Sequence, residues 1–204
     1  MLEVLTRQNE TIQRWRLGNS RLRTQVFNEL GISEGDFARN SAFFDIDDYT
    51  PSDYLKWVFD ELGQASQRPS RFTDGSIPVL YTAAESDTAL AEKVHWLPPE
   101  GGPSMYVQLV TVDAQATTKD LHLIDPRPAC LTGEAATGAY AQCLAITQEA
   151  IADQLHGFHT PSARRDGGTC TPILSKTSVL AMTEVQYVRF DFDEAQARWN
   201  AVFL

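Results

Sequence analysis

The amino-acid sequence predicts an α+β fold, because strand patterns and helix patterns follow one another along a chain of 204 residues. Ile, Val, Tyr and Ala occupy every second position over 77–83, with the period of two that is typical of a strand. Over 85–97 the apolar positions are three and four residues apart, which is the spacing of an amphipathic helix, and Glu85, Ser86 and Asp87 suit its N-terminus. Strand patterns over 105–112 and 119–124 predict that the middle of the chain is rich in β-structure.

The first third of the chain predicts one strand and a helical insert. Alternating side chains over 11–17 indicate a strand that contains Arg16. The stretch over about 18–69 is expected to insert helices ahead of the next strand, with helical patterns at 25–30 and 52–62.

A long helix and a β-rich C-terminal part complete the predicted order of elements. A turn of Thr, Ala and Gln residues is expected to separate the two middle strands, and Gly157 to cap the long helix that follows. A strand over 158–163 would then deliver Ser162 to the sheet, and strands over 173–182 and 185–192 would close it. The apolar stripe of the long helix is predicted to be Tyr140, Leu144, Thr147, Ile151 and Leu155.

Composition and charge indicate an ordinary globular protein without affinity for nucleic acid. The chain is 43% hydrophobic and 22% charged, and its length suits a single domain over 1–204. The formal net charge of −10, without any run of Lys or Arg, disfavours DNA or RNA binding and favours a basic partner.

The cysteines and the apolar runs indicate the cellular compartment in which the protein acts. Cys130, Cys143 and Cys170 are an odd number without CxxC spacing, which fits a reducing environment better than a disulfide framework. No apolar run is long enough to cross a bilayer, and the first ten residues lack the pattern of a signal peptide. We therefore expect no membrane association and a cytoplasmic site of action.

Motifs of several common enzyme classes are missing from the sequence. His156, His159 and Cys170 do not have the spacing of a standard zinc site, so no metal is predicted. Neither a Rossmann G-x-G-x-x-G nor a P-loop is present, and no G-x-S-x-G surrounds a serine.

Two stretches of the chain carry a family resemblance, RFTDGSIPVLYTAAESDTALAEKVHW over 71–96 and HTPSARRDGGT over 159–169. They resemble the RES-domain family, and the residues that name this family map to Arg71, Glu92 and Ser162. The order of elements extends the resemblance over roughly 11–190. It implies an ADP-ribosyltransferase-like split mixed β-sheet with flanking helices, and an enzyme that degrades NAD, as do several members that are toxins of toxin–antitoxin pairs.

The resemblance implies roles for the three family residues. Glu92 would face the positive charge that develops on the ribose when the bond to nicotinamide breaks. Arg71 would pair with the pyrophosphate or with an attacking phosphate, and Ser162 would orient the ribose or a phosphate. From the residue pattern alone, ordinary structural roles remain as alternatives. Glu92 would then be a solvated helix glutamate, Arg71 a surface arginine, and Ser162 a serine that satisfies the following turn.

Two further residues are candidates for contact with the ligand. Tyr81 is expected to stack on nicotinamide or ribose, or else to pack in the core. Arg16 is expected to reach the phosphates of the ligand, with a solvated edge-strand arginine as the alternative.

The resemblance implies NAD as substrate, no cofactor, and inorganic phosphate as a candidate co-substrate. Water, phosphate and a protein side chain would each capture the same ribosyl cation, so a protein ADP-ribosyltransferase is the alternative enzyme. A catalytically inactive binding module of the same fold is the alternative from another class. Unrestrained degradation of NAD would harm the host. We therefore also expect a protein inhibitor, which would be an antitoxin or an immunity protein. The alternative is delivery of the protein into another cell.

Overall fold

The computed structural model describes residues 6–19, 55, 59, 70–102, 104–124, 131 and 139–204. Within these residues the fold is α+β, as the sequence predicts. The elements are β1 (Thr6–Asn19), α4 (Ser86–Val94), β2 (Met105–Asp120), η3 (Leu121–Leu123), α5 (Ala139–Ala152), β3 (Gly157–Pro161), β4 (Thr169–Cys170), η5 (Lys176–Ser178), β5 (Val179–Asp193) and β6 (Arg198–Phe203).

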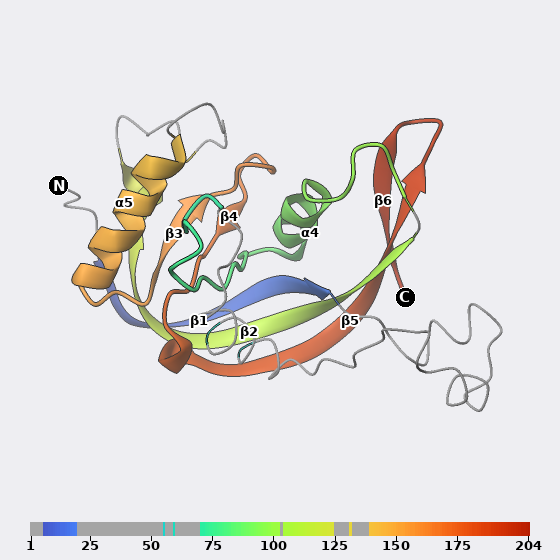
Figure 1. Ribbon diagram of the computed structural model, residues 1–204. Helices are drawn as coiled ribbons and strands as arrows, with labels where there is room; N and C mark the ends of the chain where they lie inside the picture. The colour runs from blue at the N-terminus through green and yellow to red at the C-terminus, as the bar shows by residue number, and fades with distance from the viewer. Residues whose placement is uncertain are drawn as a thin grey trace.

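One mixed six-stranded sheet organises the molecule, with the order β4-β3-β2-β5-β6 and with β1 paired to β2. Strand β3 runs parallel to β2, whereas β1 and β5 run antiparallel to it. Helices α4 and α5 lie on the same side of the curved surface of β1, β2 and β5, with the β3–β4 hairpin between them (Figure 1). The central strand β2 therefore holds three neighbours in register.

The segment around residue 83 links two parts of the sheet that are distant in sequence. Ala83 forms isolated backbone bridges to Trp15 of β1 and to Cys170 of β4, and Leu80 bridges Ile173. Because β1 and β3 both pair with β2, these bridges complete a ring through β2, β1, residue 83, β4 and β3. The ring fixes the β3–β4 hairpin relative to β1.

Three clusters of buried apolar side chains hold these elements together. The first joins α5 to β3, and its centre is an edge-on contact of Phe72 and Phe158 with ring centroids 4.8 Å apart. The second lies around Ile12, Leu80 and Ile173, and partly buried Leu55 and Phe59 pack against it. The third packs α4 on the other end of the sheet and comprises Leu97, Val107, Leu109, Val188, Phe190 and Trp199.

The predicted turn in the middle of the chain is wrong, because 105–120 form one strand. Ala114, Ala116 and Thr118 are fully or almost fully buried. The run that connects them contains no Gly or Pro, and its backbone pairs with β1 along most of its length. The small side chains in this run allow close packing of the strand. From composition alone, the same run of Thr, Ala and Gln residues predicts a turn.

The structure also differs from the predicted strand over 77–83 and from the two strands predicted over 173–182 and 185–192. Residues 77–83 are extended but pair only at isolated bridges, because their backbone hydrogen bonds are divided between Trp15 of β1 and the segment 170–173. The stretches 173–182 and 185–192 belong largely to the single strand β5, which a hairpin joins to β6. The hairpin turn has a positive φ of 49° at Ala197 and lacks the Gly or Asn that would have signalled it.

Helix α5 is present, but its buried stripe differs from the predicted one. Tyr140 and Ile151 are 39% and 46% exposed, whereas Cys143 and Ala150 are buried together with Thr147. Gly157 begins β3 rather than capping the helix, and a Cβ at this position would lie 2.5 Å from the carbonyl oxygen of Pro172. The predicted helix over 25–30 lies outside the described residues, as does most of the insert over 18–69. Of the predicted helix over 52–62, only residues 55 and 59 are described.

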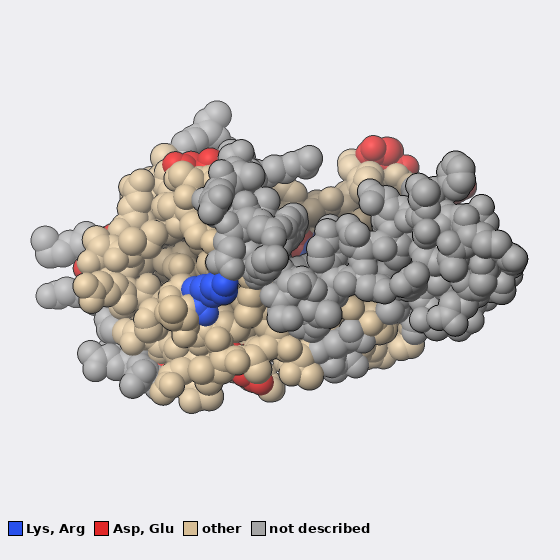
Figure 2. Space-filling model, turned by 60° about the horizontal axis from the view of Figure 1, so that its bottom comes forward, with Lys and Arg blue, Asp and Glu red and all other residues tan. Residues whose placement is uncertain are grey.

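Charge is sparse on the face drawn in Figure 2. The described Lys and Arg atoms visible there form one small group, surrounded mainly by uncharged atoms. None of the helices in the described part of the chain is both long enough and apolar enough to span a bilayer.

Candidate functional site

Helix α4 presents Glu92 to the loop that follows β3. Ser86 and Asp87 begin the helix, as the sequence predicts, and Thr88 and Ala89 are buried on its inner side. Glu92 lies one turn after Thr88, so that both side chains face the loop over 161–168. The Glu92 side chain remains 25% exposed, which leaves the carboxylate within reach of a ligand.

Ser162 follows β3 directly and binds Glu92. Its hydroxyl donates to Glu92 Oε1 at 2.7 Å, and the backbone N–H of Ala163 donates to the same oxygen at 3.2 Å. The Ser162 Oγ in turn accepts from the backbone N–H groups of Arg164 at 3.0 Å and Arg165 at 3.1 Å. These bonds fix the direction of the hydroxyl and, through it, the position of the carboxylate.

Arg71 approaches the same carboxylate oxygen from a tight turn. Its Nη2 lies 3.6 Å from Glu92 Oε1, its Nη1 donates to the carbonyl of Pro161 at 3.3 Å, and the guanidinium lies over the Phe72 ring. The side chain is 12% exposed. Arg71 is therefore held by three contacts and still has N–H donors to spare.

Tyr81 supports the turn that carries Arg71. Its hydroxyl lies 2.7 Å from Ser70 Oγ and accepts from the backbone N–H of Phe72 at 3.1 Å. Burial raises the pKa of the phenol, so it remains protonated and able to donate. These contacts are those of a positioning residue, and the predicted stacking of Tyr81 on the ligand stays a prediction.

Cys170 is a contact of Glu92 that the sequence interpretation missed. Its thiol donates to Glu92 Oε1 at 3.4 Å from strand β4. Burial first, and the Glu92 charge second, raise the pKa of Cys170 from 9.0 to about 12, so that the thiol stays neutral. The signal was its place in the hairpin that carries Ser162, two residues after the Gly-Gly turn.

The structure thus brings Arg71, Glu92 and Ser162 together, although Glu92 and Ser162 are 70 residues apart in the chain. Arg16 is part of β1, where its backbone is paired with Val110, and its side chain lies outside the described part of the structure. Its predicted contact with ligand phosphates therefore stays a prediction.

A pocket of about 610 Å³ adjoins this cluster. Residues 161–168 form most of its wall, and His122 closes another side. Arg71 and Glu92 do not line it, so Ser162 is the member of the cluster that faces both the carboxylate and the pocket. Such a volume is in the range of small-molecule sites, and its lining is polar and basic.

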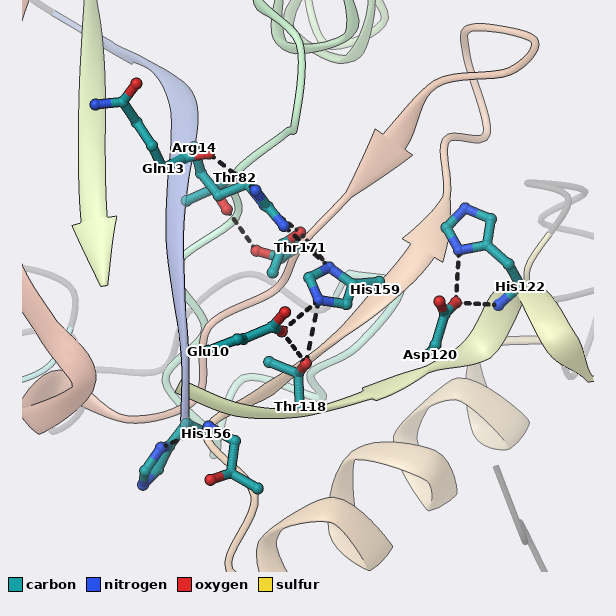
Figure 3. Close-up of polar contacts among 11 residues, drawn as sticks. Glu10, Gln13, Arg14, Thr82, Thr118, Asp120, His122, His156, His159 and Thr171 are labelled. Carbon is teal, nitrogen blue, oxygen red and sulfur yellow. Dashed lines mark hydrogen bonds and ion pairs between the residues drawn. The ribbon is translucent and has the colours of Figure 1, made fainter. Parts of the chain in front are cut away.

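His122 is a second feature that the sequence interpretation missed. Its Nδ1 lies 2.9 Å from Asp120 Oδ1 (Figure 3). Its Nε2 lies 3.4 Å from Thr169 Oγ1. Thr169 and Cys170 are consecutive in β4, and successive side chains of a strand point to opposite faces. His122 and Glu92 therefore lie on opposite sides of the hairpin. The sequence signal was an Asp and a His two residues apart at the end of a strand.

A buried polar network lies inside the ring of strands (Figure 3). His159 Nε2 is 2.6 Å from Glu10 Oε1 and 3.1 Å from Thr118 Oγ1, while its Nδ1 is 3.1 Å from Thr171 Oγ1 and 3.2 Å from Arg14 Nη2. The network ties β1 to β2, β3 and the segment after β4. It stabilises the scaffold beneath the site.

The three residues weighed as zinc ligands have separate partners. His156 Nδ1 accepts from the backbone N–H of Thr117 at 3.1 Å, His159 joins the buried network, and Cys170 contacts Glu92. Among the described residues no group of three or more His, Cys, Asp and Glu side chains is placed to hold a metal ion.

Comparison with known protein families identifies the chain. The model of the RES domain matches residues 44–197, which is most of the sequence. The chain belongs to the RES-domain family. The match includes Arg71, Glu92 and Ser162, whereas β1, β6 and Arg16 lie outside it.

The wider comparisons add little to this RES-domain assignment. No protein with a curated description matches the sequence. Among solved structures, the M. tuberculosis MbcT–MbcA toxin–antitoxin complex is similar to this chain with a TM-score of 0.47 and 10% identity. That alignment covers 87% of this chain and 86% of the other. The assignment to the RES-domain family therefore rests on the family match.

Proposed function

We propose that this RES domain cleaves the bond between nicotinamide and ribose in NAD, by hydrolysis or phosphorolysis. The observation that carries the proposal is the meeting of Arg71, Glu92 and Ser162 around one carboxylate oxygen. Membership of the RES-domain family supports NAD as the substrate.

Glu92 would stabilise the reacting ribose. All its contacts with described residues go to Oε1, which leaves Oε2 for a ribose hydroxyl and for the positive charge on the ribose. When the glycosidic C–N bond breaks, its electron pair goes to the ring nitrogen and nicotinamide leaves as a neutral molecule. A carboxylate already fixed in position lowers this barrier without having to reorganise.

Arg71 and Ser162 would position the substrate around Glu92. The guanidinium fork matches two phosphate oxygens, in a way that an ammonium group does not. Ser162 would keep the Glu92 carboxylate oriented, and its own hydroxyl would lie beside the pocket. Misplacement of either by about 1 Å can cost a hundredfold in rate.

The acceptor determines the product. Attack by water forms a C–O bond, releases one proton and yields ADP-ribose. Attack by inorganic phosphate yields ADP-ribose 1-phosphate instead, and attack by a protein side chain yields ADP-ribosylated protein.

The direct test is to incubate the purified chain with labelled NAD, with and without inorganic phosphate, and to follow free nicotinamide. Nicotinamide release with unlabelled protein is the expected result, and a dependence on phosphate would assign the acceptor. Labelled protein would indicate an ADP-ribosyltransferase. Absence of both products would leave an inactive binding module and overturn the proposal.

An unrestrained NAD-degrading enzyme in a cytoplasm would drain a metabolite that its host needs. We therefore propose that the chain acts as a toxin in the cytoplasm and that a protein inhibitor, an antitoxin or an immunity protein, covers the site. The alternative is delivery into another cell, in which case safety comes from export.

A further inference from the structure

Two adjacent arginines line the pocket beside Ser162, but they differ in their partners. Arg165 Nη1 donates to Thr88 Oγ1 at 3.1 Å and lies 3.7 Å from Glu85 Oε2, and its Nη2 lies 3.8 Å from Asp87 Oδ2. Its charge is therefore offset by carboxylates at the start of α4, and its role is to hold the loop on the helix.

Arg164 has no such compensation. Its side chain makes one hydrogen bond, from Nη2 to His95 Nε2 at 2.8 Å. Its Nε is buried and has no hydrogen-bond partner among the described residues. No described carboxylate oxygen lies within ion-pair distance of its guanidinium, whereas Arg165 next to it has two.

His95, the partner of the Arg164 side chain in the described part of the chain, is uncharged. Burial and the neighbouring Arg164 charge lower the pKa of His95, although Glu92 opposes this shift. A neutral imidazole accepts the Arg164 hydrogen bond through its unprotonated Nε2. No described carboxylate therefore pairs with the positive charge of Arg164, and among the described residues that line the pocket the acidic one is the exposed Asp166.

A guanidinium charge that no carboxylate offsets costs free energy in the unliganded protein, and an anion bound in the pocket would offset this cost. Phosphate groups are the ligands that match a guanidinium best. The pocket volume of about 610 Å³ is ample for one.

We infer that Arg164 binds a phosphate group in this pocket, whereas Arg165 is structural. The source is either the pyrophosphate of the dinucleotide or an inorganic phosphate that acts as acceptor. The choice between these ligands rests on the proposed function, but the anion site itself does not.

The test compares Arg164→Gln with the matched variant Arg165→Gln. Calorimetry would measure the binding of ADP-ribose, inorganic phosphate and pyrophosphate to each folded protein, with adenosine as the ligand that lacks phosphate. We expect Arg164→Gln to weaken at least one phosphate-bearing ligand tenfold or more. Arg165→Gln should change affinity by less than threefold, because Ser162 and Ala163 still hold the loop on Glu92, but it should lower the melting temperature, because one contact between the loop and α4 is lost.

The ligands separate the two sources. If Arg164→Gln loses affinity only for inorganic phosphate, the ligand of Arg164 is the phosphate that acts as acceptor. If it loses affinity only for ADP-ribose, the ligand is the pyrophosphate of the substrate. Since binding is measured without turnover, a protein that binds these ligands through Arg164 and does not cleave NAD would refute the proposed function alone.

Three outcomes would overturn the inference: unchanged affinity in Arg164→Gln, equal losses in both variants, or no binding of any phosphate-bearing ligand by the wild-type chain. Circular dichroism establishes that each variant is folded. Should Arg164→Gln fail to fold, the same binding measurements are made on Arg164→Lys. This variant keeps the positive charge but lacks the planar guanidinium fork. In that variant affinity should fall severalfold, and wild-type affinity would refute the inference.

Discussion

Glu92 receives its contacts on one carboxylate oxygen, from a hydroxyl, a backbone N–H, a thiol and a guanidinium. An amide oxygen at the same place can still accept from Ser162 and from the backbone of Ala163. Replacement by glutamine therefore removes the charge while most of the local hydrogen bonds are kept. This makes Glu92→Gln a test of charge rather than of folding.

We predict that Glu92→Gln lowers the rate of NAD cleavage at least about a hundredfold, which corresponds to roughly 3 kcal/mol. The reason is the loss of a fixed negative charge aimed at the reacting ribose. The rate of nicotinamide release is the measurement, and Glu85→Gln on the same helix is the control, since Glu85 binds Thr88 and the backbone of Thr169 instead. Wild-type turnover in a folded Glu92→Gln protein would refute the assignment.

The neutral state of Cys170 leads to a second prediction at this scale. The thiolate is the reactive form of cysteine, and a pKa raised from 9.0 to about 12 leaves about a thousandfold less thiolate at pH 8. We expect iodoacetamide to modify Cys170 at least about a hundredfold more slowly in the folded protein than in urea, as peptide mapping by mass spectrometry would measure. Equal rates in the two states would mean that the thiol is neither buried nor held by Glu92.

At the scale of elements, the loop over 161–168 and helix α4 form one unit. Arg165 contacts the first turn of the helix, Ser162 reaches Glu92 further along it, and Gly168 packs against Thr88. A Cβ at Gly168 would lie 2.5 Å from Thr88 Oγ1 and 3.1 Å from Thr88 Cγ2. The glycine therefore sets how closely the loop approaches the helix.

We predict that Gly168→Ala displaces the loop and lowers NAD cleavage by about tenfold to a hundredfold, because Ser162 moves relative to Glu92. Gly167→Ala is the matched control: its Cβ meets no atom within 4 Å, and its φ of +70° adds strain of only about 1–2 kcal/mol. Thr88→Ala in the Gly168→Ala background should restore part of the rate by removing the clash. Equal rates in the two glycine variants would contradict the role of this contact.

At the scale of the whole molecule, a net charge of −10 contrasts with a site at which Arg71 and Arg164 carry positive charge. An acidic exterior steers basic partners, whereas an acidic segment or a C-terminal carboxylate can occupy the phosphate position and pair with Arg71. An inhibitor that combines both features would compete with the substrate directly.

We predict that expression of the wild-type chain alone lowers NAD in a test bacterium and stops growth, whereas Glu92→Gln does neither. Co-expression of its neighbouring open reading frames should relieve the effect if one of them encodes the inhibitor. Growth and total NAD are the measurements. A harmless wild-type chain with unchanged NAD would refute both the toxin proposal and the need for an inhibitor.

The sequence alone determined the α+β class, the first strand, the start of α4 at Ser86 and the strand that leads to Ser162. These features depend on near neighbours: a period of two, a helix start, and a glycine turn after a short strand. The family residues Arg71, Glu92 and Ser162 were identified by resemblance, because no local pattern distinguishes them from surface residues. Their roles remain predictions.

Tertiary structure decided what depends on distant partners. Residues 105–120 form one strand because β1 and β5 pair with it, although Ala, Thr and Gln residues in its middle favour no particular structure by themselves. Helix α5 turns Cys143 and Ala150 inward because Phe72 and Phe158 lie opposite, which its own periodicity did not reveal. Contacts such as that of Cys170 with Glu92 arise only once the β3–β4 hairpin packs against helix α4, and their free energy depends on burial that no single segment encodes.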